Sequence, residues 1–119
     1  MKAFNSLYLF AGVLTATICA AGAQSSVAAP TQAEIRTLEA SVVLPPGASP
    51  LSKYNRHYAV VVQGSIRHIL GVYIGDGGKL YVTTPEKLPR VLDGGCGVVN
   101  VEYDVTTNRF LSVTCNGEA

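Results

Sequence analysis

The segment from Val98 to Asn116 constrains the fold of this chain more than any other part of its sequence. Apolar and polar residues alternate along both halves of the segment, and Thr106-Thr107-Asn108 separates the halves. Alternation with a period of two is typical of a β-strand with one buried face. The segment therefore predicts a hairpin over residues 98–116, with strands at 98–105 and 109–116. Asn108 is expected to take the left-handed conformation of a three-residue loop.

The register of this hairpin follows from the same alternation. We expect Val99 to face Cys115, Val101 to face Val113, Tyr103 to face Leu111 and Val105 to face Arg109. One face then carries Val99, Val101, Tyr103, Val105, Leu111, Val113 and Cys115, and the other face is mainly polar. A shift by one residue would mix the two sets, so the hydrophobic pattern selects this pairing.

Three more strands are predicted upstream, at residues 58–63, 66–74 and 80–84. Each is rich in β-branched and aromatic residues, and turns rich in Gly, Ser and Asp separate them. Gly64-Ser65 suits a two-residue hairpin turn. Strands 58–63 and 66–74 are apolar on both faces, which is typical of central strands. The fold class is therefore mainly β, with a single curved antiparallel sheet of about five strands in a small domain over residues 53–117.

Residues 24–52 form a segment rich in Ala, Ser and Pro that contains one helix signal. Thr31 and Glu34 match a capping box, and Ile35, Leu38 and Val42 follow on one helical face. This spacing predicts a short helix over residues 32–42. So short a helix persists only if it docks on other parts of the protein. Two alternatives stay open here: a docked helix, which would make the fold α+β, and a flexible tether.

The first 23 residues have the three parts of a secretory signal peptide. Lys2 is followed by an apolar stretch, and Ala21-Gly22-Ala23 provides the small residues that a signal peptidase requires. We expect cleavage after Ala23 and a periplasmic or secreted protein without stable membrane insertion. The alternative is an uncleaved anchor, because the apolar stretch is just long enough to span a bilayer.

Cleavage would leave two of the three cysteines. Cys19 belongs to the expected signal segment, whereas Cys96 and Cys115 remain in the exported chain. An exported chain with two cysteines predicts one disulfide between them. The alternative, a reactive thiol pair, lacks the close spacing of a redox motif.

Charge and residue types narrow the range of functions. The formal net charge is +1 and falls to zero when Lys2 is removed, which argues against a nucleic-acid partner. His57 and His68 are the only histidines, and the predicted hairpin separates them too widely to share a metal ion. We therefore expect no metal site, no cofactor and no enzymatic activity. The alternatives are a small envelope hydrolase that uses His68 with Asp76 or Asp93, and a purely structural envelope protein.

A binding role remains as the leading hypothesis. Basic and aromatic side chains are interleaved around the first hairpin, and such residues often anchor protein contacts. The candidate partner-binding residues are Tyr54, Arg56, His57, Tyr58 and Arg67. The order of a helix followed by antiparallel strands resembles cystatin-like and other small inhibitor folds in architecture, without a shared motif. The sequence thus predicts an exported, disulfide-stabilised binding or inhibitor-like module that offers a sheet face or edge to a protein or envelope component.

Overall fold

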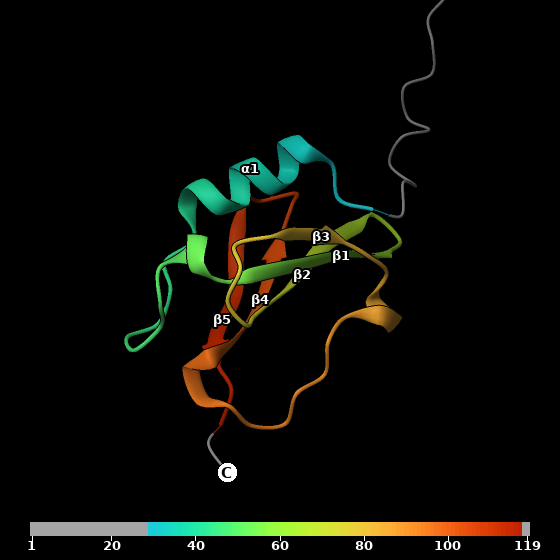
Figure 1. Ribbon diagram of the computed structural model, residues 1–119. Coiled ribbons are helices and arrows are strands. Elements are labelled where there is room, and N and C mark those ends of the chain that lie inside the picture. The colour runs from blue at the N-terminus through green and yellow to red at the C-terminus, as the bar shows by residue number, and fades with distance from the viewer. Residues whose placement is uncertain (1–28, 118–119) are drawn as a thin grey trace, which may run out of the picture.

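Five strands form one sheet in the order β3-β1-β2-β4-β5 (Figure 1). The computed structural model describes residues 29–117, so the expected signal peptide and its cleavage site lie outside the described residues. The elements are α1 (Gln32–Ser41), β1 (Asn55–Gln63), β2 (Ile66–Ile74), β3 (Leu80–Val82), β4 (Val98–Asp104) and β5 (Arg109–Cys115). Short 3₁₀ turns lie at Leu51–Lys53, Pro85–Lys87 and Gly95–Gly97. The fold is mainly β, and β1 and β2 take inner positions, as their two apolar faces predict.

The pairing of β3 corrects the expectation of a wholly antiparallel sheet. The pairs β1–β2, β2–β4 and β4–β5 are antiparallel, but β3 runs parallel to β1. Because β4 occupies the other edge of β2, the chain leaving β2 passes the beginning of β1 and continues on its far side. A Cβ on Gly78 would lie 2.6 Å from the carbonyl oxygen of Ser52, and one on Gly77 would lie 2.7 Å from Asn55 Oδ1. Glycine is therefore needed where the two segments cross.

The hairpin of β4 and β5 confirms part of the predicted register. Val99 faces Cys115 and Val101 faces Val113, as the alternation predicts. A β-bulge next to Glu102 and Tyr103 then shifts the pairing, so that Tyr103 faces Phe110 instead of Leu111. Leu111 is 51% exposed, whereas Phe110 packs against the core. Asn108 has a φ of 56°, which confirms its left-handed conformation.

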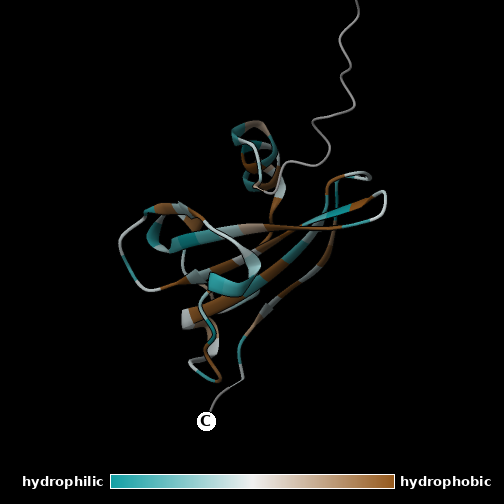
Figure 2. Cartoon of the chain, turned by 90° about the vertical axis from the view of Figure 1, so that its right-hand side faces the viewer, coloured by the Kyte–Doolittle hydropathy of each residue, from teal (hydrophilic) through white to brown (hydrophobic). Residues whose placement is uncertain are grey.

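One face of the sheet and one side of α1 enclose the core. Hydrophobic segments alternate with hydrophilic ones along the strands (Figure 2). The buried core residues are Ile35, Leu38, Tyr54, Tyr58, Val60, Ile69, Tyr73, Val99, Val101 and Tyr103. The predicted capping box starts the helix: Thr31 Oγ1 accepts the Glu34 N–H at 3.0 Å, and Glu34 Oε1 accepts the Thr31 N–H at 2.9 Å. The helix is docked, which decides between the two alternatives for residues 32–42.

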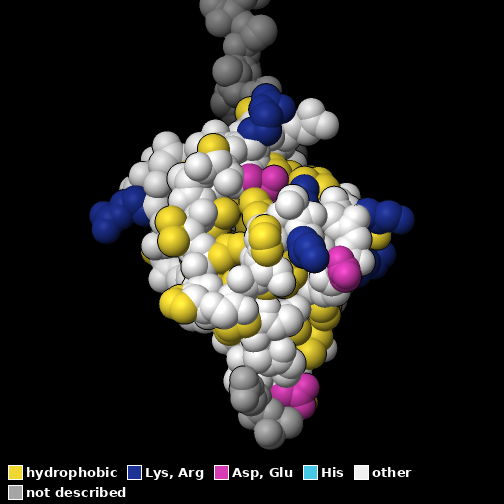
Figure 3. Space-filling model, turned by 60° about the vertical axis from the view of Figure 1, so that its left-hand side comes forward, with side chains coloured by type: hydrophobic (Ala, Val, Ile, Leu, Met, Phe, Trp, Pro, Cys, Tyr) yellow, Lys and Arg dark blue, Asp and Glu magenta, His cyan; other side chains and the backbone are white. Residues whose placement is uncertain are grey.

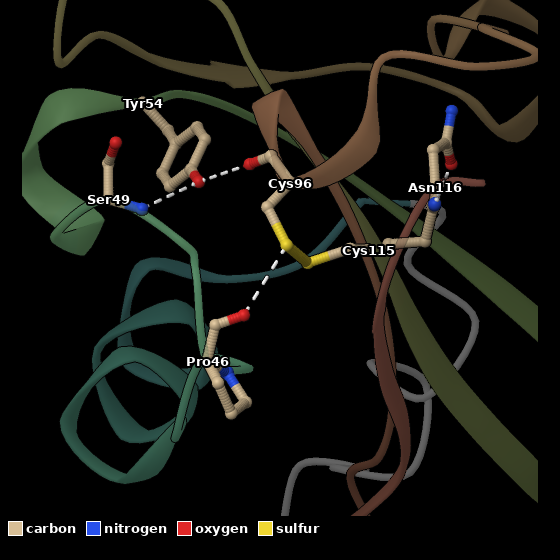
Figure 4. The surroundings of a disulfide bond; sticks show 7 residues. Pro46, Ser49, Tyr54, Cys96, Cys115 and Asn116 are labelled. Atoms are coloured by element: carbon tan, nitrogen blue, oxygen red, sulfur yellow. Dashed lines mark hydrogen bonds between the residues drawn. A yellow bond between two sulfur atoms is a disulfide. The ribbon is translucent and has the colours of Figure 1, made fainter. Parts of the chain in front are cut away.

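A disulfide joins Cys96 to Cys115, as predicted (Figure 4). It ties the 3₁₀ turn before β4 to the end of β5. The sulfur of Cys96 lies 3.6 Å from the carbonyl oxygen of Pro46, in the turn that follows α1. Nearby, the Tyr54 hydroxyl donates to the Cys96 carbonyl oxygen at 2.6 Å and accepts the Ser49 N–H at 3.0 Å. The disulfide therefore connects the helix segment as well as the last hairpin to the rest of the fold.

Candidate functional site

The two arginines among the predicted partner-binding residues make ion pairs with α1. Arg56 Nε lies 2.7 Å from Glu39 Oε2, and Arg67 Nε lies 2.9 Å from Glu34 Oε2. The side chains of both arginines are mostly buried. Burial raises the cost of ionising Glu34, but the hydrogen bonds and charge of Arg67 and the hydrogen bonds of Thr31 outweigh this cost and lower the pKa of Glu34. Both arginines thus dock the helix on the sheet.

The two tyrosines of the predicted set belong to the core. Tyr54 is buried beside the disulfide, and Tyr58 is buried beneath α1. The Tyr58 hydroxyl donates to Glu39 Oε2 at 2.7 Å and lies 2.9 Å from the Tyr73 hydroxyl. Burial is the main reason that the pKa of Tyr58 is raised strongly and that of Tyr73 to about 12. Both hydroxyls therefore stay neutral at physiological pH.

His57, the last of the predicted residues, contacts the edge strand of the sheet. Its ring is stacked on the ring of Tyr81, with centroids 4.6 Å apart and an interplanar angle of 11°. Partial burial lowers the pKa of His57, so the ring is mainly neutral at pH 7. The predicted residues do not form one exposed patch, and their role in partner binding stays a prediction. The ring of His57, however, contacts β3, a strand that the sequence does not single out as a binding site.

β3 is an edge strand with exposed apolar side chains. Leu80, Tyr81 and Val82 are 42%, 41% and 46% exposed. On its inner side, Arg56 donates its N–H to the Lys79 carbonyl oxygen, and Thr83 donates its N–H to that of Tyr58. Since backbone groups of a strand point alternately to its two sides, those of Leu80 and Val82 point away from β1. The outer edge of β3 therefore offers unpaired backbone donors and acceptors within the described part of the chain.

A groove of about 280 Å³ lies between this edge and α1. Its lining residues are Gln32, Ile35, Arg36, Glu39 and Leu80. Figure 3 shows one side of the molecule on which hydrophobic side chains gather around its middle, with Lys and Arg side chains both beside them and at the periphery. The register places Leu80 and Val82 on the same side of the sheet as Tyr58 and the helix. The unpaired backbone groups of β3 therefore lie directly beside the apolar groove.

Sequence reasoning missed this site because it treated residues 80–84 as one strand of an antiparallel sheet. Two signals were present in the chain: the strand is short, and Pro85 follows it closely. Proline is confined to the margins of sheets, so its position is compatible with an edge. The contribution of Arg36 and Glu39 could not be found from the sequence, because it depends on how α1 lies over β3.

The other face of the sheet holds a smaller depression of about 220 Å³. Leu70 and Val72 of β2 and Leu88 of the β3–β4 connection contribute to it. At its margin, His68 Nδ1 lies 3.0 Å from Glu102 Oε2. Within residues 29–117, His68 forms no hydrogen bond with Asp76 or Asp93, the carboxylates of the hydrolase alternative.

The described residues contain neither a cluster of metal ligands nor a membrane-spanning helix. Across residues 29–117, no three His, Cys, Asp or Glu side chains gather as ligands of a metal ion would. The same range contains no helix with the length and apolarity needed to cross a bilayer. Comparison of the chain with protein-family models, with curated proteins and with solved structures finds no match.

Proposed function

We propose that this chain is an exported, disulfide-stabilised binding module that takes an extended segment of another protein as an additional strand beside β3. The observation that carries this proposal is the open edge of β3 next to the α1 groove. Main-chain hydrogen bonds to Leu80 and Val82 would provide affinity, and side chains entering the groove would provide specificity. The cross-linked chain also suits an oxidising compartment, where disulfides persist.

The composition of β3 supports the proposal further. Exposed sheet edges are usually protected by charged residues, prolines, bulges or very short strands, and of these protections the strand β3 itself has only its shortness. The three residues of β3 are all apolar or aromatic, and each is exposed by more than 40%. An edge of this kind is a liability in a free protein but an advantage where a partner strand covers it. This contrast favours a binding role over a purely structural one.

The proposal can be tested with a library of random nine-residue peptides displayed on phage. After the library is panned against the purified, oxidised protein, the enriched peptides are synthesised and added to labelled protein. Amide hydrogen exchange is then followed by NMR. We expect the amides of Leu80 and Val82 to exchange rapidly in the free protein and to become protected when peptide binds. The amide of Thr83, already bonded to Tyr58, should be protected throughout.

Two variants of one exposed residue and a matched control distinguish strand addition at β3 from non-specific hydrophobic binding. Val82→Pro removes an outward N–H, and Val82→Lys places a charge beside the groove. Leu111→Lys is the control, because Leu111 is similarly exposed, at 51%, but lies on β5 at the opposite edge. Both Val82 variants should weaken peptide binding at least tenfold, and the control should not. If no enriched peptide protects the Leu80 and Val82 amides, or if Leu111→Lys weakens binding equally, the proposal is wrong.

A further inference from the structure

Resting on the proposed function, we infer that the segment docked beside β3 is acidic: it carries an Asp or Glu side chain on its helix-facing side, held by Arg36. The chemistry of the partner follows from the charges that line the groove. Some of these charges are already neutralised within the protein, and one is not.

Glu39, the one carboxylate among the lining residues that the structure describes, is already paired. Glu39 Oε2 accepts hydrogen bonds from Arg56 Nε and from the Tyr58 hydroxyl, both at 2.7 Å. Arg56 in turn is mostly buried, with a side-chain exposure of 13%. Glu39 and Arg56 therefore form a neutral pair at the floor of the groove. A ligand in the groove meets little net charge from these two residues.

Among the described residues that line the groove, the other charged side chain is that of Arg36. Arg36 lines the groove from α1, is exposed, and forms no ion pair with any residue in the range 29–117. A guanidinium group binds a carboxylate through two parallel hydrogen bonds, which gives it a geometric preference for Asp and Glu. Charge complementarity at this groove thus favours an acidic segment.

The geometry places such a carboxylate within one row of side chains. In an added strand, alternate side chains point to the same face of the sheet as Leu80 and Val82. This is the face that α1 covers, and Arg36 lines the gap between α1 and β3. One helix-facing position of the segment can therefore approach Arg36, while the neighbouring helix-facing positions cover Leu80 and Val82 with apolar side chains.

The same charges disfavour a second copy of this chain as the occupant. Antiparallel pairing of β3 with itself would relate the two copies by a two-fold axis through the shared edge. Each copy would bring its own α1 to the same face, so that the Arg36 side chains of both copies would lie along one seam. Like charges in such a seam repel each other. A foreign acidic segment neutralises the charge of Arg36, whereas a second copy adds another positive charge.

The test uses the same phage library and compares two variants that remove one positive charge each. Arg36→Gln removes the proposed carboxylate partner. Arg109→Gln is the matched control, because Arg109 is exposed and begins β5, at the opposite edge of the sheet. Peptides enriched on the unaltered protein should carry Asp or Glu at one helix-facing position. Panning on Arg36→Gln should lose this enrichment, and panning on Arg109→Gln should keep it.

Synthetic peptides then measure the interaction between the acidic side chain of the peptide and Arg36 directly. The best enriched peptide is compared with a version in which the acidic residue is replaced by its amide. The acidic peptide should bind the unaltered protein about fivefold more tightly, as expected for one partly exposed ion pair. The ratio of the two peptide affinities should fall close to one in Arg36→Gln, and in the unaltered protein it should decrease with added salt. Sedimentation of the free protein at high concentration checks the second copy as occupant.

The outcomes distinguish this inference from the proposed function. If peptides protect the Leu80 and Val82 amides but show no acidic preference, or keep it in Arg36→Gln, the acidic partner is wrong and the proposed function stands. If no peptide protects those amides, the proposed function fails and the inference falls with it. A dimer that protects the Leu80 and Val82 amides without peptide would overturn the inference in favour of self-pairing.

Discussion

At the scale of single residues, Glu39 organises the polar groups beneath α1. Its Oε2 accepts hydrogen bonds from Arg56 and from Tyr58, and the Tyr58 hydroxyl contacts that of Tyr73. A hydroxyl has one proton, so Tyr58, which donates to Glu39, accepts the proton of Tyr73. Each member of this buried network thus depends on its neighbour. Removing one hydroxyl leaves another without a partner, which costs more than the bond itself contributes.

The substitution Tyr58→Phe tests this network. It keeps the buried ring but removes the hydroxyl that links Glu39 to Tyr73. We expect the free energy of unfolding to fall by about 1–3 kcal/mol, because the Tyr73 hydroxyl stays buried without its acceptor. Urea denaturation measures the change. Tyr81→Phe is the control, since Tyr81 is 41% exposed, and its loss should stay within about 0.5 kcal/mol. Equal losses in both variants would contradict the role of the network.

The ion pair of Glu34 with Arg67 predicts a dependence of stability on pH. The pKa of Glu34 is lowered in the folded protein, where the contacts of Arg67 and Thr31 outweigh the cost of burial. A lowered folded-state pKa contributes stability that is present above the unfolded pKa and is lost as the pH falls through the folded value. Glu34→Gln should therefore be less stable than the unaltered protein at pH 7, by up to about 1 kcal/mol. Urea denaturation from pH 7 down to pH 3 should show this difference shrinking, and a constant difference would contradict it.

At the scale of elements, the position of β3 depends on the crossing of residues 75–79 over the start of β1. Gly77 donates its N–H to the Lys53 carbonyl oxygen at 3.0 Å, and Lys79 donates its N–H to Asn55 Oδ1 at 3.1 Å. These bonds hold the turn against the chain that enters β1. The open edge, and with it the proposed binding site, exists only because the chain can pass so closely here.

Two glycines separate the effect of this close crossing from that of backbone conformation. Gly78 and Gly64 have φ values of +68° and +63°, but only Gly78 would place a Cβ against another residue, 2.6 Å from the Ser52 carbonyl oxygen. Gly64→Ala should cost about 1–2 kcal/mol for its left-handed conformation. Gly78→Ala should cost about 1–3 kcal/mol more, because backbone must move. It should also speed amide exchange at Thr83, which Gly64→Ala should not. Equal losses of stability and equal Thr83 exchange in the two variants would show that the crossing has room for a Cβ at Gly78.

The elements also show how far the sequence determines the fold. Alternation in residues 98–116 predicted the pairing of Val99 with Cys115, because a shifted register would have exposed the apolar set. It failed beyond Glu102, since Phe110 and Leu111 are both apolar and the pattern cannot tell which one faces the core. The parallel placement of β3 was not predictable, because it depends on contacts between residues 75–79 and 52–55. The groove depends in turn on that placement, so the sequence, which predicted binding at a sheet face or edge, gave no indication of β3.

At the scale of the whole molecule, ion pairs between α1 and the sheet and a disulfide at one end of the sheet hold residues 29–117 together. Arg56 and Arg67 hold α1 to the sheet, and the disulfide fastens the turn before β4 to the end of β5. Asn116, next to Cys115, adds hydrogen bonds from its side-chain amide to the carbonyl oxygens of Val91 and Asp93. A domain this small buries only a modest share of its surface, so its net stability depends strongly on a cross-link. The disulfide is therefore expected to determine whether the binding edge is presented at all.

Replacing Cys96 and Cys115 together by Ser tests this dependence. The cysteines are 19 residues apart, and opening a loop of that length should lower the free energy of unfolding by about 3 kcal/mol. Urea denaturation of the oxidised protein, the reduced protein and the double variant measures the loss, which should be similar in the last two. The amides of Ser49 and Asn116 should exchange faster, because they lie where Tyr54 and the disulfide join the helix segment to the last hairpin. Thiol labelling of the oxidised protein should find Cys96 and Cys115 unreactive. Two reactive thiols, or a loss below about 1 kcal/mol, would show that the fold and its open edge do not depend on this bond.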